Sequence, residues 1–176
     1  MRALLLLFSV FGLLALKGDN KNVIGKHDES GYVVKYSPLG NYLASGSNDN
    51  TIKVWDASSK KLIKEFSAHS VGVKDLVFTP DNKYLISAGL DNLIKVWEVG
   101  SWKLKKNLTE HTSQVLALAL SADGKTLFSG GDDKRIIIWD TKNFKKTGEL
   151  DGHFDRVLSL GVSKNGKYLV STGGDR

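Results

Sequence analysis

Four histidines divide this 176-residue chain into units of equal length, because each stands 42 residues after the one before. Every histidine is followed at offsets of +18, +22 and +28 by a serine, an aspartate and a tryptophan, up to the end of the chain. The recurring quartets are His27, Ser45, Asp49, Trp55; His69, Ser87, Asp91, Trp97; His111, Ser129, Asp133, Trp139; and, without a tryptophan, His153, Ser171, Asp175. Self-similarity at this period predicts a repeat architecture in which small units stack on one another.

Each unit contains four short runs with β character, separated by glycine, proline, asparagine and aspartate turns. In the second unit we expect strands at Val73–Phe78, Tyr84–Ser87, Leu93–Trp97 and Lys103–Leu108. Outside the N-terminal segment, no stretch has the period of an amphipathic helix. A sheet of four strands is too small to bury both of its faces alone, so each unit must pack on its neighbours.

The side chains of one quartet can be joined in a single chain of hydrogen bonds. Tryptophan only donates, serine and neutral histidine both donate and accept, and an ionised aspartate only accepts. A chain that runs from tryptophan through serine and histidine to aspartate therefore satisfies every group. Because a buried polar group without a partner costs about 1–3 kcal/mol, we expect each quartet to be buried and complete.

The residues of the repeat resemble those of the WD-repeat β-propeller family. The resemblance is carried by Ser45–Asp56, by Gly152-His153 and by the first half of each unit, as in Val77–Asp81. It extends from about residue 19 to Arg176, and it implies an all-β propeller of four-stranded antiparallel blades with each quartet buried in its blade. On this basis blades are expected at about 27–68, 69–110 and 111–152, with a shorter fourth blade at 153–176.

Residues 20–26 are expected to form an outermost strand with no first three strands before it. Ile24 stands three residues before His27, as Phe66 stands before His69. In the family, such an N-terminal strand closes the ring by completing the last blade. With three full blades and two strands of a fourth, this makes fifteen strands, and we expect the chain to be a truncated part of a larger propeller.

Residues 1–18 have the pattern of a signal peptide. Arg2 precedes 14 uncharged, mostly apolar residues, Ala3–Leu16. This run is shorter than the about 20 residues of a transmembrane helix and fits a secretory core. We therefore expect export to the periplasm or the extracellular space, and no transmembrane span in a mature chain whose net charge falls from +6 to +4 with the loss of Arg2 and Lys17. The alternatives are a buried strand and an uncleaved anchor.

Lysines gather at the turn into the fourth strand of each full unit. They are Lys60, Lys61, Lys64; Lys103, Lys105, Lys106; and Lys142, Lys145, Lys146. In a propeller they would form a basic rim that attracts acidic partners or anionic lipids. Alternatively, lysine on an outermost strand blocks edge-to-edge pairing. Nucleic acid is not the expected partner, because export is expected and arginines and aromatic residues are not interleaved.

The motifs argue against catalysis. A serine, a histidine and an aspartate suggest a hydrolase triad, but the trio recurs in every unit and no Gly-x-Ser-x-Gly elbow surrounds its serine. One histidine per blade keeps the histidines apart, so no metal site is expected, and neither cysteines nor a phosphate-binding loop are present. We expect no enzyme activity and no cofactor. A central-channel active site is the alternative, although the innermost strands carry few charges beyond Lys35, Lys74 and Asp75.

The expected function is that of a non-catalytic protein-interaction scaffold, as the family resemblance implies. Partners of such propellers often contact the loops before the first strand and between the second and third strands. In this chain those loops select Ser30, Tyr32, Asn48, Gly72, Lys74, Leu90, Gln114, Leu116, Asp132, Arg156, Leu158 and Gly174. Trp102, the one tryptophan outside the repeat position, is expected to cover the edge of its own blade. The alternative function is a sensor propeller with a catalytic or signalling domain beyond residue 176.

Overall fold

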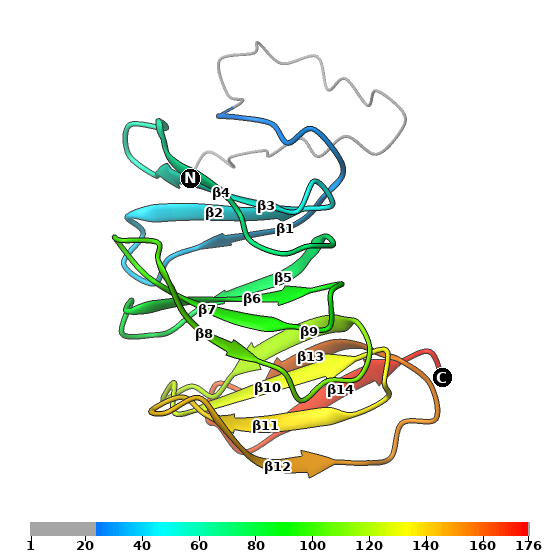
Figure 1. The fold of residues 1–176 in the computed structure, drawn as a ribbon. Helices are drawn as coiled ribbons and strands as arrows, with labels where there is room; N and C mark the ends of the chain where they lie inside the picture. The colour runs from blue at the N-terminus through cyan, green and yellow to red at the C-terminus, as the bar shows by residue number, and fades with distance from the viewer. Residues whose placement is uncertain (1–23, 176) are drawn as a thin grey trace, which may run out of the picture.

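The computed structural model describes residues 24–175, which form 14 strands in four antiparallel sheets (Figure 1). The first sheet contains β1 (Gly31–Tyr36), β2 (Tyr42–Ser47), β3 (Thr51–Asp56) and β4 (Leu62–Ser67). The second contains β5 (Val73–Phe78), β6 (Tyr84–Gly89), β7 (Ile94–Glu98) and β8 (Leu104–Leu108). The third contains β9 (Val115–Leu120), β10 (Thr126–Gly131), β11 (Ile136–Asp140) and β12 (Lys145–Leu150), and the fourth contains β13 (Val157–Val162) and β14 (Leu169–Gly173).

The sheets stack side by side in chain order, through contacts between their first strands β1, β5, β9 and β13 (Figure 1). Within each four-stranded sheet, strands that are neighbours in sequence pair with each other. This arrangement confirms the predicted fold class, an incomplete β-propeller with three full blades and half of a fourth. Among residues 24–175, no helix offers an apolar stretch long enough to cross a bilayer.

The strands lie close to the positions expected from the sequence. β5 has the predicted bounds, whereas β6, β7 and β8 differ from the prediction by one or two residues at one or both ends. The predicted signal peptide and most of the predicted closing strand lie outside the described residues. Residues 24–26 are irregular, and Gly25 lies against the first blade, where an added Cβ would meet Trp55 Nε1 at 2.9 Å.

β-Bulges recur at the same two places in each full blade. One lies near the start of the first strand, and the other lies in the fourth strand, opposite the tryptophan of the third strand and the residue before it. A bulge bends its strand and increases the local twist. The repeat is therefore preserved in the shape of the blades as well as in their sequence, which allows successive blades to stack in the same way.

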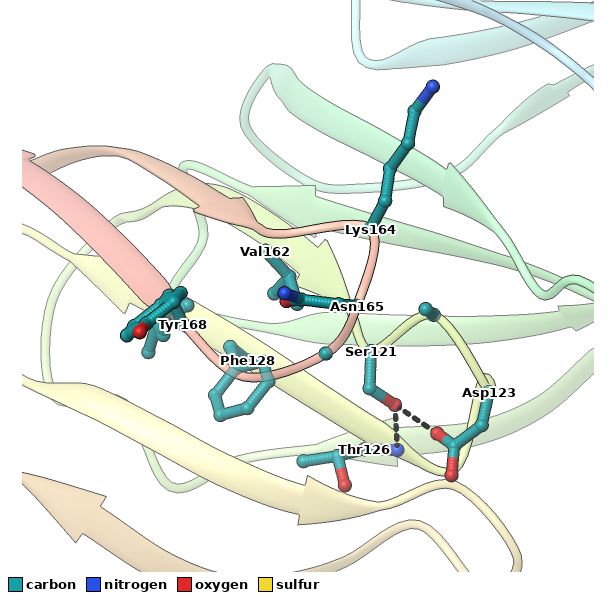
Figure 2. Close-up of a pocket in the computed structure, with 11 residues that line it drawn as sticks. Ser121, Asp123, Thr126, Phe128, Val162, Lys164, Asn165 and Tyr168 are labelled. Atoms are coloured by element: carbon teal, nitrogen blue, oxygen red, sulfur yellow. Dashed lines mark hydrogen bonds between the residues drawn. The ribbon is translucent and has the colours of Figure 1, made fainter.

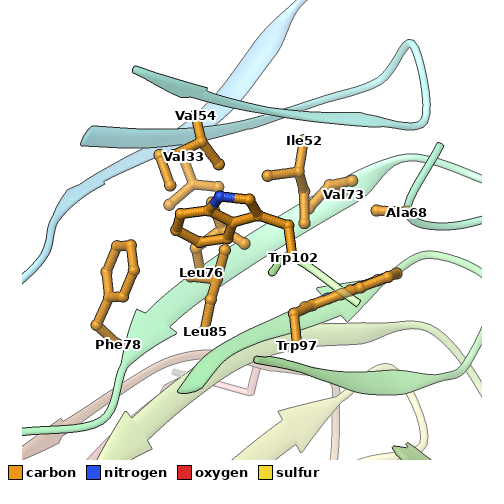
Figure 3. Close-up of a cluster of buried hydrophobic side chains, with 11 residues drawn as sticks. Val33, Ile52, Val54, Ala68, Val73, Leu76, Phe78, Leu85, Trp97 and Trp102 are labelled. Atoms are coloured by element: carbon orange, nitrogen blue, oxygen red, sulfur yellow. The ribbon is translucent and has the colours of Figure 1, made fainter. Parts of the chain in front are cut away.

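The hydrophobic core lies between neighbouring blades (Figure 3). One cluster joins the first and second blades and contains Val33, Ala44, Ile52, Val54, Ala68, Val73, Leu76, Phe78, Leu85, Trp97 and Trp102. Another joins the second and third blades and contains Ile86, Ala88, Ile94, Val96, Leu108, Val115, Leu118, Leu127, Ile137, Trp139 and Phe144. A blade thus buries its apolar residues against its neighbours, as the small size of a four-stranded sheet predicts.

Trp102 belongs to this core, so the prediction that it covers the edge of its own blade is wrong (Figure 3). Only 6% of Trp102 is exposed, and its ring stands edge-on to Tyr42 of the preceding blade, with 5.2 Å between ring centroids. Phe144 makes the same contact with Tyr84 of the preceding blade at 5.3 Å. The prediction failed because the periodicity of one unit carries no information about which neighbour a turn side chain reaches.

Candidate functional site

In the second and third blades, the quartet forms one continuous chain of hydrogen bonds. Trp97 Nε1 donates to Ser87 Oγ at 2.9 Å, and that oxygen lies 2.8 Å from His69 Nε2. His69 Nδ1 lies 2.8 Å from a carboxylate oxygen of Asp91. In the third blade the corresponding three distances are all 2.8 Å. Because an ionised aspartate only accepts, His Nδ1–H donates to it, and Nε2 of the neutral ring then accepts from the serine hydroxyl, whose oxygen accepts from the indole.

The quartet aspartates also hold backbone amides. Asp91 accepts the N–H of Ser70 at 3.0 Å and the N–H of Leu93 at 3.3 Å. Asp133 makes the equivalent pair of bonds at 3.0 and 3.3 Å. One amide belongs to the loop before the first strand and the other to the loop between the second and third strands. Each carboxylate therefore ties two loops of its blade together.

The electrostatics agree with this direction of hydrogen bonding. Burial lowers the pKa of His69, in opposition to the charge of Asp91, and so favours the neutral imidazole. Burial alone would raise the pKa of Asp91, but the Ser70 amide and the His69 ring hold it below its usual value. At Asp49 burial again acts to raise the pKa, but hydrogen bonds from Thr51 and His27 outweigh it and lower the pKa to about 2. A neutral histidine between a hydroxyl donor and an ionised carboxylate leaves none of these groups unsatisfied.

The first and fourth quartets have the same histidine contacts. His27 lies 2.5 Å from the oxygen of its serine and 2.9 Å from its aspartate, and the Trp55 ring stands edge-on to it at 6.3 Å. His153 lies 2.7 Å from the oxygen of its serine and 3.0 Å from its aspartate. The fourth quartet is less buried, since 19% of the His153 side chain is exposed against 1% for His111.

The quartet serines are not placed to act as nucleophiles. Ser87 and Ser129 are fully buried, and each hydroxyl is already engaged by an indole and an imidazole. A hydrolase serine must instead reach a substrate carbonyl. Within residues 24–175, no three histidine, aspartate or glutamate side chains come together as metal ligands. In the second blade the quartet hydrogen bonds join a loop, β6 and β7 to one another.

Asp75 is the only acid on the innermost strands β1, β5, β9 and β13. Burial raises the pKa of this carboxyl, against the charges of Lys35 and Lys74 and the amides that it accepts. One of its oxygens accepts the N–H of Leu76 at 2.8 Å, and the other accepts the N–H of Leu118 in the next blade at 2.8 Å. One oxygen thus bonds within β5 and the other joins β5 to β9, so the carboxylate is a link between blades.

A hollow of about 430 Å³ lies between the β9–β10 turn and the β13–β14 turn (Figure 2). Ser121 Oγ donates to Asp123 at 2.6 Å and accepts the N–H of Thr126 at 2.9 Å. These polar groups serve the conformation of the turn.

The loops that carry the histidines and quartet aspartates form one face of the molecule, which we call the histidine face. It comprises loops 24–30, 48–50, 68–72, 90–93, 109–114, 132–135, 151–156 and 174–175, at the right of Figure 1. The predicted partner-binding residues lie on these loops or at the strand ends that adjoin them. Their role in partner binding stays a prediction.

The structure brings several of these residues together across the first two blades. The Lys74 ammonium lies 4.3 Å from the centroid of the Tyr32 ring, a cation–π geometry. The Tyr32 hydroxyl donates to Asn48 Oδ1 at 3.2 Å, and Asn48 Nδ2 donates to Glu29 Oε2 at 2.5 Å. Leu90 is half-buried on the same face. Glu29 and Asn48 from two loops, and Tyr32 and Lys74 from the starts of β1 and β5, thus form one group across two blades.

A second group spans the third and fourth blades. Arg156 Nε lies 3.4 Å from Asp132 Oδ1, and the N–H of Asp132 donates to the backbone oxygen of Gln114 at 2.8 Å. Leu158 is exposed and Leu116 is half-buried. Of the remaining predicted positions, Ser30 is half-buried, Gly72 is buried beneath Leu90, and Gly174 is exposed.

Sequence reasoning missed two exposed apolar residues of the histidine face. Phe154 is 85% exposed and Val71 is 48% exposed. Phe154 occupies the repeat position that holds Asp28, Ser70 and Thr112 in the other units. An aromatic residue where the other units have a polar one was the available signal for this position.

The predicted basic rim is partly occupied by contacts within the molecule. Lys105 lies 3.4 Å from Glu98, and Lys146 lies 2.6 Å from Glu149. Lys106 donates to two backbone oxygens of the next blade at 2.8 and 2.9 Å. Three of the nine predicted lysines therefore have partners inside the chain, and one of them helps to join two blades.

Curated relatives match a limited part of this sequence. The WD repeat domain-containing protein 83 homolog of Dictyostelium discoideum is 42% identical over 57 residues, which cover 32% of this chain and 18% of that protein. The nuclear distribution protein PAC1 of Tuber melanosporum is 40% identical over 58 residues, which cover 33% of this chain and 13% of that protein. The similarity thus extends over less than a fifth of each relative.

Solved structures match over most of the chain. Those of U3-55K and of the RRP9 WD40 repeats each superpose with a TM-score of 0.79 at 24% identity and cover 86% of this chain. The chain spans about half of their length, 48% and 47% respectively. At this level of identity the likeness shows the fold alone.

The relatives contradict the predicted export. They are intracellular proteins, so the prediction of a periplasmic or extracellular location is wrong. The prediction failed because a short apolar run after one positive charge is not specific to signal peptides. Other apolar segments have the same length and composition. The argument against nucleic acid that rested on export falls with it, and only the argument from arginine and aromatic patterning remains.

The matches to a family model recur with the 42-residue period of the sequence. The family model described as WD domain, G-beta repeat, matches residues 19–56, 60–98, 102–140 and 144–176. Three of these matches end one residue after a quartet tryptophan, so they are in phase with the 42-residue period. Because the four matches cover most of the chain and the structure has the corresponding stacked four-stranded blades, this chain belongs to the WD40 repeat family.

Proposed function

We propose that this chain is a non-catalytic scaffold that binds partner proteins on its histidine face. The observation that carries the proposal is the ordered contact between Lys74 and the Tyr32 ring, which joins two blades on this face. Membership of the WD40 family supports a scaffold over an enzyme. The burial of Ser87 and Ser129 supports the same conclusion, because it withdraws the serine–histidine pairs from any substrate.

Two aromatic side chains are suited to anchor a partner. Tyr32 is 41% exposed and is held in place by Lys74 and Asn48, so that little side-chain freedom is lost on binding. Phe154 projects from the fourth blade and is 85% exposed. Aromatic anchors of this kind concentrate the binding energy of protein interfaces, while polar residues such as Arg156 form the surrounding rim.

The double variant Tyr32→Ala/Phe154→Ala tests the proposal, because it removes both anchors and leaves the quartets intact. Proteins captured on the immobilised wild-type chain are quantified by mass spectrometry and compared with those captured on the variant. For a captured protein that is then purified, we expect the variant to bind at least about tenfold more weakly, since loss of an anchor costs more than about 1 kcal/mol.

The matched control is Leu62→Ala/Leu104→Ala, which removes two apolar side chains that are 49% and 46% exposed on the outer strands β4 and β8. This control should bind the purified partner as the wild type does. Unchanged binding by the anchor variant, or equal loss in the control, contradicts the assignment of partner binding to the histidine face.

A further inference from the structure

The two loop faces of the molecule carry opposite charges. The face opposite the histidine face, which we call the lysine face, comprises loops 37–41, 57–61, 79–83, 99–103, 121–125, 141–144 and 163–168, at the left of Figure 1. It carries eight lysines and two aspartates, a net charge of six positive. The histidine face carries ten acids and four bases, a net charge of six negative.

The lysine face is a continuous surface because backbone contacts join its turns. In each full blade, the turn between the third and fourth strands donates a backbone N–H to the turn between the first and second strands: Ala57 to Asn41 at 2.9 Å, Val99 to Lys83 at 2.9 Å and Thr141 to Lys125 at 3.0 Å. The turns of neighbouring blades also touch, since a Cβ added to Gly124 would lie 2.7 Å from Pro80. The lysines of different turns and blades are thereby placed beside one another.

The positive charge of this face is largely uncompensated. All eight lysines are exposed: Lys60, Lys61, Lys83, Lys103, Lys125, Lys142, Lys164 and Lys167. Lys83 pairs with Asp81 at 3.1 Å and Lys125 with Asp123 at 3.7 Å, in exposed pairs that contribute little energy. The other six lysines have no acidic partner within residues 24–175.

A hollow of about 490 Å³ lies on this face between the second and third blades. Three lysines and three aspartates line it together with the apolar surfaces of Pro80 and Tyr84: Lys83, Lys125, Lys142, Asp81, Asp123 and Asp140. A side chain that enters this hollow would have an apolar wall and both ammonium and carboxylate groups around it. The hollow is thus suited to an apolar side chain, while Lys142 and the lysines without an acidic partner on the neighbouring turns offer positive charge to carboxylates beside it.

We infer that the lysine face binds an acidic segment of a partner protein, which places an apolar side chain in the hollow and its carboxylates against the lysines around it. This interaction goes beyond the binding proposed for the histidine face, because it uses the opposite side of the molecule. Complementary charge at an interface steers association and selects the partner. Exposed Leu39, at 68%, offers a further apolar contact beside the lysines.

A protein segment fits this face better than nucleic acid does. Each basic residue of the face is a lysine and none is an arginine, whereas arginine is the preferred residue for bidentate contacts to phosphates and bases. Asp81 and Asp123 stand between the lysines, so an evenly charged phosphate backbone would lie against carboxylates. A peptide can instead place its acids opposite the lysines and leave neutral residues opposite the aspartates.

The test uses the 176-residue chain and a fluorescein-labelled synthetic peptide in which aspartate and glutamate alternate with leucine and phenylalanine. Binding is measured by fluorescence anisotropy. The variant Lys83→Glu/Lys125→Glu/Lys142→Glu reverses three charges at the hollow, and Lys64→Glu/Lys134→Glu/Lys145→Glu reverses three exposed lysines elsewhere. Both variants have the same net charge, and thermal unfolding by circular dichroism establishes that both fold like the wild type.

We expect the wild type to bind the acidic peptide, the first variant to bind it about tenfold or more weakly, and the second to change by about twofold or less. The Tyr32→Ala/Phe154→Ala variant should bind the peptide as the wild type does, which separates this inference from the proposed function. Absence of binding, equal loss in both charge variants, or equal binding of a peptide with asparagine and glutamine in place of the acids would overturn the inference. Tighter binding of a single-stranded RNA that the first variant abolishes would also overturn it, in favour of nucleic acid.

Discussion

At the scale of single residues, each quartet aspartate satisfies a histidine and backbone amides at once. Asp91 lies within hydrogen-bond distance of His69 Nδ1 and of the amides of Ser70 and Leu93. Removing its carboxylate would leave these donors without an acceptor, and the histidine among them is buried. The quartet therefore contributes to stability mainly because it keeps buried polar groups paired, more than through the strength of any one bond.

Asp91→Ala is accordingly expected to destabilise the chain by about 1–3 kcal/mol, the cost of a buried donor without a partner. Urea unfolding followed by tryptophan fluorescence measures this difference. Asp28→Ala is the matched control, because Asp28 is exposed and its loss should change stability by about 0.5 kcal/mol or less. An Asp91→Ala chain as stable as the wild type would show that the quartets contribute no net stability.

At the scale of strands and turns, the turn between the third and fourth strands connects a blade to the one before it. Trp102 and Phe144 occupy the same position of this turn, with φ of +55° and +52°, and both are buried against a tyrosine of the preceding blade. Lys60 occupies the equivalent position of the first blade with φ of +61°, and it is exposed. The three blades thus share the backbone conformation of this turn, whereas contact with the preceding blade depends on which side chain occupies the position.

Trp102→Ala is expected to destabilise the chain by about 3–5 kcal/mol, because it removes a large buried ring and leaves a cavity between two blades. Thermal unfolding followed by circular dichroism measures the effect. Lys60→Ala changes the same turn position where the side chain is exposed and should cost about 0.5 kcal/mol or less. Similar losses in the two variants would mean that the turn itself, and not the buried ring, stabilises the stack.

At the scale of the whole molecule, the spacing of the blades depends on small residues in the second strands. A Cβ added to Gly46 in β2 would lie 2.5 Å from Val73 Cγ1 of the next blade, and one added to Gly130 in β10 would lie 2.5 Å from Val157 Cγ1. Ala88 stands at the equivalent position of the second blade. The distance between two blades is therefore set by each pair of facing residues, and it cannot be read from the repeat alone.

Gly46→Ala is expected to destabilise the chain by about 1–3 kcal/mol, the usual cost of adding a group to a packed core. Gly161→Ala is the control, because a Cβ added there meets nothing within 4 Å and alanine is at least as favourable as glycine inside a strand. Urea unfolding compares the two variants. Unchanged stability of Gly46→Ala would show that the first and second blades can move apart without cost.

Much of this molecule was predictable from its repeat. The 42-residue period indicated four units, the turn residues indicated four strands in each of the three full units, and the donors and acceptors of the quartet indicated the order of its hydrogen bonds. The bounds of β5 agree with the prediction because alternating apolar residues between turn signals define a strand directly. Information of this kind is local, since it depends on residues within one unit.

Contacts between units were decided only by the tertiary structure. The approach of Trp102 to Tyr42, the link from Asp75 to the amide of Leu118 and the contact of Lys74 with Tyr32 each join two blades. The lysines that gather on one face likewise come from the turns of different blades. The sequence by itself determined what each blade is, because strand pairing and the quartet are satisfied within 42 residues. Which side chains meet across blades depends on the spacing and twist of the stack, because side chains distant in the chain come into contact only when the blades pack.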